Sequence, residues 1–164
     1  MLNTLRGTAA GALLLTGISA LFLVPLFMLL GAERVLVGSS LEFNTLWIGI
    51  AMVVSLTAAT LGGWFAHRVS GGLAAVVVLA VAVMAFGLAD ATVHHWLIPQ
   101  ISLSREGLSG LNLLPGLREP LWYDLAGPAL MAAFIWIAGS SRHIEKEVGQ
   151  SQTGGRRFSK SSDR

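Results

Sequence analysis

The residues that decide the fold are those at positions 8–30, TAAGALLLTGISALFLVPLFMLL. This stretch holds no charged side chain, and a helix that crosses a bilayer needs about 20 predominantly apolar residues. It exceeds the ~7–15-residue apolar core of a cleaved signal peptide, and no small-residue cleavage pattern follows it. We therefore predict a retained transmembrane helix over 8–30, with a kink caused by Pro25.

Three further apolar runs follow, at 45–66, 73–95 and 120–139. Tryptophans near the ends of the second run suit the aromatic belt at a membrane surface, and Pro128 predicts a kink in the last run. We predict an all-α integral membrane protein, a four-transmembrane-helix bundle that forms one membrane domain over residues 1–142.

The composition supports this class. The 164 residues are 54% hydrophobic and 12% charged, whereas roughly 25% of the residues in a soluble domain are charged. There are too few polar side chains to cover a soluble surface. The absence of cysteine from the sequence excludes a disulfide framework, thiolate-bound metals and thiol redox chemistry.

Two segments are too polar to span a membrane. Residues 96–119 form a long outer loop between the third and fourth helices, which we expect to fold over the mouth of the bundle or to include a short interfacial helix. Residues 143–164 are basic, rich in Ser and Gly and without hydrophobic periodicity. We expect them to form a mostly disordered cytoplasmic tail.

The basic residues predict the orientation of the bundle. Eight of the 11 Lys and Arg residues lie in the N-terminus, the turn between the second and third helices, and the tail. This excess favours a multi-pass protein of the cell inner (plasma) membrane with both termini in the cytoplasm. The tail cations either bind anionic lipid headgroups or only fix this topology, so lipid, and not nucleic acid, is the expected partner. The cations concerned are Arg142, Lys146, Arg156, Arg157 and Lys160.

Small residues at four-residue spacing predict where helices pack closely, because lipid tails are as apolar as leucine and helices in a membrane gain most from close approach. The second helix has such a ridge, and shorter pairs occur in the first and fourth. These ridges pack either against helices of the same chain or against a partner subunit. They comprise Gly7, Gly11, Ala51, Ser55, Ala59, Gly63, Ala129 and Ala133.

Asp90 is a charged residue within a predicted span, where charge is costly and often functional. His94 lies one turn later on the same helix face, and Asp124 lies in the first turn of the fourth helix at the same outer level. Two carboxylates and an imidazole could bind a divalent metal such as zinc, copper or iron, or relay protons. In the alternative structural reading, Asp124 only benefits from the helix dipole and Asp90 only accepts a hydrogen bond from a neighbouring helix.

Other chemistry finds little support. His67 and His143 lie at the inner ends of their helices, but each adjoins an arginine in the headgroup region, so we do not expect haem. The sequence contains neither a phosphate-binding glycine loop nor a nucleophile elbow.

Three functions therefore remain open. The first hypothesis is a small non-catalytic subunit that stabilises a larger membrane complex with other membrane protein subunits. The second is a metal-binding or proton-relay protein that uses Asp90, His94 and Asp124. The third is a small transporter.

Overall fold

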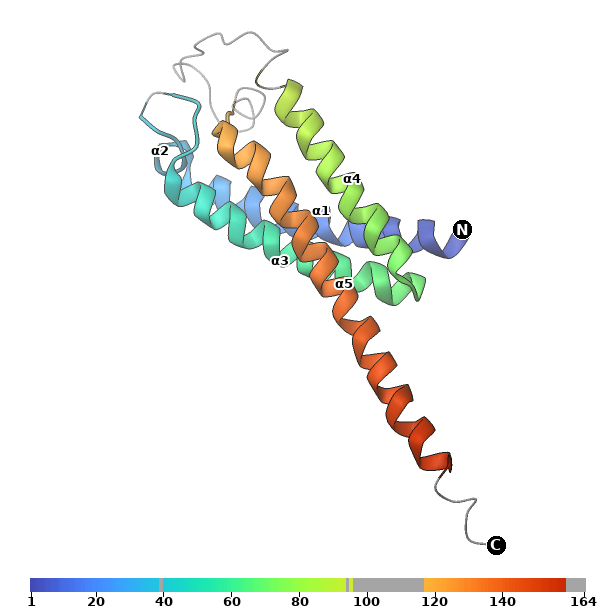
Figure 1. Cartoon of the computed structure of the whole chain (residues 1–164). Helices are drawn as coiled ribbons and strands as arrows, with labels where there is room; N and C mark the ends of the chain where they lie inside the picture. Colours follow the sequence, from blue (N-terminus) through green and yellow to red (C-terminus); the bar gives the residue numbers. More distant parts are fainter. Residues whose placement is uncertain (39, 94, 96–116, 159–164) are drawn as a thin grey trace, which may run out of the picture.

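The computed structural model describes residues 1–38, 40–93, 95 and 117–158, the segment 142–158 as backbone alone. Within these residues the chain is helical: α1 at Leu2–Leu30, the short α2 at Ala32–Val35, α3 at Thr45–Ser70, α4 at Leu73–Thr92 and α5 at Leu121–Phe158 (Figure 1). We call the end at which α1 and α4 finish and α3 and α5 begin the distal end. The opposite end is the proximal end.

Four helices of the described chain are long and apolar enough to cross a membrane: α1, α3, α4 and the Leu121–Ser141 part of α5. The prediction of four spanning helices is thus confirmed at the level of helix length and composition. The ends differ from the predicted ones, since α1 already begins at Leu2 and α3 continues to Ser70.

Local signals in the sequence set the ends of α3. The Asn44 side chain accepts a hydrogen bond from the Trp47 backbone N–H at 2.8 Å, which caps the helix. At the other end Gly71 adopts a left-handed conformation with φ 73°, and its N–H donates to the His67 carbonyl at 2.8 Å. A left-handed backbone conformation costs least free energy at glycine. The helix therefore ends there, and α4 begins two residues later.

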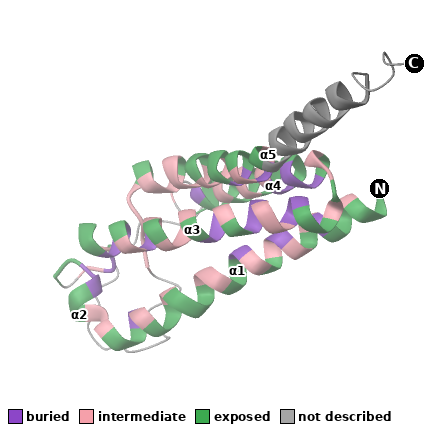
Figure 2. Cartoon of the chain, turned by 90° about the horizontal axis from the view of Figure 1, so that it is seen from below, coloured by how far each residue is buried: buried purple, intermediate pink, exposed green. Residues whose placement is uncertain are grey.

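Close packing of small residues holds the proximal half together. A Cβ on Gly11 of α1 would lie 2.7 Å from the Gly62 carbonyl of α3, and a Cβ on Gly63 would lie 2.8 Å from the Ile135 Cα of α5. In this way α1 packs on α3, and α3 packs on α5. The buried core lies along these contacts (Figure 2). It comprises Leu15, Ala58, Ala59, Ala66, Ala75, Val76, Leu79 and Ile135.

A second apolar cluster closes the distal end. Residues 40–43 run back along residues 36–38, with an antiparallel bridge between Leu36 and Phe43. Beneath it Phe27, Val35 and Trp47 are buried together. The same segment forms a parallel bridge from Glu42 to Arg118, three residues before α5 begins at Leu121. The residues just before α5 are thereby bonded to residues 36–38 and 40–43. We call these residues the cap, because they lie over the distal ends of α1 and α3.

The backbone of α5 continues beyond the bundle to Phe158 (Figure 1). The predicted disorder of the tail at residues 143–164 stays a prediction. The segment contains good helix formers (Glu145, Lys146, Glu147 and Gln150) and no proline, so the helix of the preceding span propagates into it. Of the outer loop predicted at residues 96–119, residues 96–116 lie outside the described residues.

Candidate functional site

The contact between α4 and α5 brings two carboxylates to the same level. A Cβ on Gly87 of α4 would lie 2.6 Å from the Pro128 Cβ of α5, and near the proximal end Gly139 of α5 packs in the same way on Val76 of α4. The two helices are therefore antiparallel neighbours. Asp90 lies three residues after Gly87 and Asp124 four residues before Pro128, so each carboxylate stands about one turn beyond the contact, toward the distal end.

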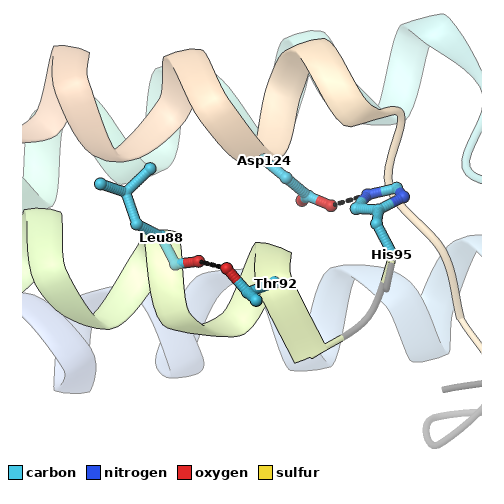
Figure 3. A network of polar contacts seen from close by, with 4 residues as sticks. All are labelled: Leu88, Thr92, His95 and Asp124. Atoms are coloured by element: carbon cyan, nitrogen blue, oxygen red, sulfur yellow. Dashed lines mark hydrogen bonds and ion pairs between the residues drawn. The ribbon is translucent and has the colours of Figure 1, made fainter. Parts of the chain in front are cut away.

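Asp124 pairs with an imidazole. The distance from His95 Nε2 to Asp124 Oδ2 is 2.6 Å, and the two side chains are only 20% and 11% exposed. Figure 3 shows His95 reaching from the end of α4 to the first turn of α5. When Asp124 is ionised, the Nε2–H of His95 is the donor of this hydrogen bond, because a carboxylate has no proton to donate. This distance is short for a hydrogen bond between nitrogen and oxygen, so the two side chains are in close contact.

Glu119 joins the pair from just outside α5. Its neighbour Arg118 is held by backbone hydrogen bonds to the cap: the Arg118 N–H donates to the Leu41 carbonyl at 3.0 Å, and the Phe43 N–H donates to the Arg118 carbonyl at 3.1 Å. Burial raises the pKa of the Glu119 carboxyl to about 8, and its hydrogen bond to Asp124 and the nearby negative charges of Asp124 and Asp90 add to this rise. Glu119 is therefore protonated at neutral pH.

These groups surround a hollow with two parts. Its mouth is a cavity of about 500 Å³, with the carboxyl groups of Glu42, Asp90, Glu119 and Asp124 in its wall. Its chamber is a cavity of about 400 Å³ between α1, α3, α4 and α5, with mostly apolar walls. The mouth and the chamber adjoin, because both are lined by Phe43, Asp90, Leu117, Glu119 and Asp124.

The structure brings together part of the predicted cluster. Asp90 and Asp124 both line the hollow, whereas His94 lies outside the described residues. His95 is the imidazole that contacts Asp124. Among the residues that the structure describes, no three His, Cys, Asp or Glu side chains are grouped so that they could hold a metal ion. The metal site that requires His94 remains a prediction.

Sequence reasoning missed Glu119. It was counted as part of the polar outer loop, although its position directly before Pro120 places it at the entrance to a helix. The position next to Pro120 was the feature of the sequence that could have indicated this role. A proline suits the first position of a helix, so an acidic residue beside it lies near the first turn. Ser55, which was predicted as a packing residue, lines the chamber, where its side chain forms a hydrogen bond with Tyr123.

The predicted packing ridges have different surroundings. Gly7 and Gly11 of α1 lie against α3, and the ridge of α3 is buried apart from Ser55. Ala129 and Ala133 of α5 are exposed. The side chains of Arg142, Lys146, Arg156 and Arg157, and the whole of Lys160, lie outside what the structure describes.

Comparisons with protein-family models, with curated proteins and with solved structures find no match to this chain. Its fold and its site therefore define its class: an all-helical chain with four helices able to span a membrane and a carboxyl-lined hollow at the distal end.

Proposed function

We propose that this is a multi-pass protein of the plasma (inner) membrane that takes up and releases protons at the distal hollow, on the outer side of the membrane. The observation that supports the proposal most strongly is the hydrogen-bonded series Glu119–Asp124–His95, in which three titratable groups adjoin one another. Such a series can pass a proton without any large movement of the backbone.

The chemistry of each step follows from the groups themselves. Neutral Glu119 donates its O–H to the Asp124 carboxylate, and Asp124 also accepts the Nε2–H of His95. A proton that leaves Glu119 passes to Asp124, and His95 stabilises the charge left in the series. A pKa near 8 places this exchange close to the pH of the surroundings, where proton transfer is most efficient.

The orientation rests on the distribution of basic residues. Arg6 and Arg68 lie at the proximal end, where the tail with its six further cations begins, whereas Arg34 and Arg118 lie at the distal end. The positive-inside rule then assigns the proximal end, with both termini, to the cytoplasm. The hollow would exchange protons with the outer solution.

Infrared spectroscopy of the protein in lipid bilayers tests the proton site. A protonated carboxylic acid gives a C=O band that disappears on ionisation. We expect such a band at pH 6, its loss as the pH rises through about 8, and its absence from the Glu119→Gln variant. Glu42→Gln is the matched control, because Glu42 lines the same mouth but is exposed. Full ionisation of every carboxyl group at pH 7 would rule out the proposed site.

A second candidate function is that of a stabilising subunit in a larger membrane complex, and a specific observation favours it. Ala129 and Ala133 stand on an exposed face of α5, where a partner helix could approach closely. In mild detergent, Ala133→Trp should then release a co-purifying membrane protein, while Ala82→Trp, at an exposed alanine of α4, should not. A chain that purifies as a lone monomer argues against this role.

A further inference from the structure

The walls of the chamber are suited to apolar groups with delocalised charge. Trp47 is 6% exposed and Phe27 8% exposed, so these walls are part of the buried cluster and not loose surface side chains. Trp47 packs edge-on against Phe27 at 5.8 Å between ring centroids and stacks with Phe43 at 6.0 Å. Aromatic faces of this kind attract organic cations as well as apolar surface.

The chamber also borders the side of the bundle. At the proximal end α1 and α4 touch, where the Thr8 hydroxyl donates to the Ala75 carbonyl. Toward the distal end α4 diverges from α1 (Figure 1), and there Val24 and Met28 of α1 line the chamber although each is about half exposed. An apolar molecule could enter the chamber sideways from the hydrocarbon of a membrane.

The charge of the mouth selects the sign of the ligand. Four carboxyl groups line it, against one guanidinium and one imidazole. Among the residues that the structure describes, the charged and titratable groups around Glu119 are Glu42, Asp90, His95, Arg118, Tyr123 and Asp124. Acidic groups outnumber basic ones in this set, and the interactions of Glu119 and Asp124, which also line the apolar chamber, are strengthened by its lower dielectric constant. An anionic or phosphate headgroup is therefore disfavoured, and a cation is favoured.

We propose that the distal hollow binds a lipophilic monovalent cation, an organic ammonium or phosphonium ion, with its apolar substituents in the chamber and its charge among Asp90, Glu119 and Asp124. This inference rests on the proposed proton site, since the cation replaces the proton of Glu119. The exchange is balanced: the O–H bond of Glu119 breaks, the carboxylate keeps the electron pair and faces the cation, and the proton passes to the Asp124 carboxylate and from there to water at the mouth, which Asp124 lines.

Two ions of the same shape and opposite charge test the selectivity. The full chain in phosphatidylcholine nanodiscs is dialysed against radiolabelled tetraphenylphosphonium or tetraphenylborate. We expect saturable binding of the cation only, and about tenfold weaker binding (~1.4 kcal/mol) in the Asp90→Asn variant. Glu33→Gln is the charge control, because Glu33 is exposed and does not line the hollow. Saturable binding of both ions, or an unchanged affinity in Asp90→Asn, would overturn the proposal.

A glycine pair tests the location. Gly127 lines the chamber, and a Cβ there would meet just the ring of Tyr123 at 4.0 Å, so Gly127→Leu fills the chamber without forcing helices apart. We expect it to abolish cation binding. Gly17→Leu, at an exposed helical glycine with nothing within 4 Å of its Cβ, should bind as the native chain does. If both variants bind equally well, the ion lies elsewhere.

Proton release separates this inference from the function on which it rests. In weakly buffered solution at pH 7, each bound cation should release up to one proton, and the release should disappear in Glu119→Gln. If the cation fails to bind, or binds without proton release, while the infrared band still titrates near pH 8, the exchange is refuted and the proton site stands. If that band is absent, the proton site itself fails.

Discussion

Gly87→Ala offers a sharp test of how the site is built. The new Cβ would lie 2.6 Å from Pro128 Cβ and closer still to Pro128 Cγ, whereas ordinary contact begins at about 3.4 Å. The proline ring is bonded to its own backbone and cannot rotate away. The α4 and α5 helices must therefore separate locally by at least 0.8 Å, the difference between the two distances. Overpacking of this kind costs about 1–3 kcal/mol.

The matched control is Gly49→Ala, because Gly49 of α3 is exposed and has nothing within 4 Å of a Cβ. An exposed helical Gly→Ala change should stabilise by about 0.5–1 kcal/mol. Unfolding in mixed micelles of increasing dodecyl sulfate content, followed by circular dichroism, compares the two. We also expect the pKa of Glu119 to fall in Gly87→Ala, because separation admits water to the site. Equal stability of the two variants, with unchanged titration of Glu119, would refute the reasoning.

Three further outcomes follow from the structure. The folded protein holds a proton on Glu119 up to about pH 8, while the unfolded chain loses it near the ordinary pKa of 4.5. The free energy of unfolding should therefore fall as the pH rises through this window. In unfolding curves measured at several pH values, Glu119→Gln should remove that fall. Gly63→Leu should separate α3 from α5, since its Cβ meets the Ile135 backbone, and should reduce the yield of folded protein in detergent by size-exclusion chromatography, whereas Gly17→Leu should not. Asn44→Ala should lower the free energy of unfolding by ~1 kcal/mol, through loss of the cap on Trp47 N–H; an unchanged value would mean that the cap contributes nothing.

Apolar run length was sufficient to predict the four spanning helices, because a stretch with so little charge has few other ways to satisfy its backbone in a membrane. It also placed Asp90 and Asp124 at one level, since counting residues along two antiparallel helices measures depth. Residue types therefore predicted two of the four carboxyl groups that line the mouth in the described residues, those of Asp90 and Asp124.

The rest of the site depends on backbone contacts that residue types do not specify. Glu119 reaches Asp124 because the neighbouring Arg118 pairs with the cap through its N–H and C=O groups, and any residue could supply these. The partners of the small-residue ridges could not be predicted either. The spacing of small residues indicates that two helices can pack closely, but it does not indicate which helices do so. Gly11 is buried against α3, whereas Ala133 in a similar pattern is exposed.

Cross-linking across the distal hollow measures the central claim most directly. The sequence contains no cysteine, so a His95→Cys, Asp124→Cys double variant can be treated in native membranes with a short dithiol-reactive cross-linker. We expect rapid intramolecular cross-linking, because the native side chains are in contact. The control pair replaces Asp124→Cys with Leu46→Cys, at an exposed residue of α3 at the same end. Cross-linking of the first pair no faster than the control would contradict the convergence of α4 and α5 on which the account depends.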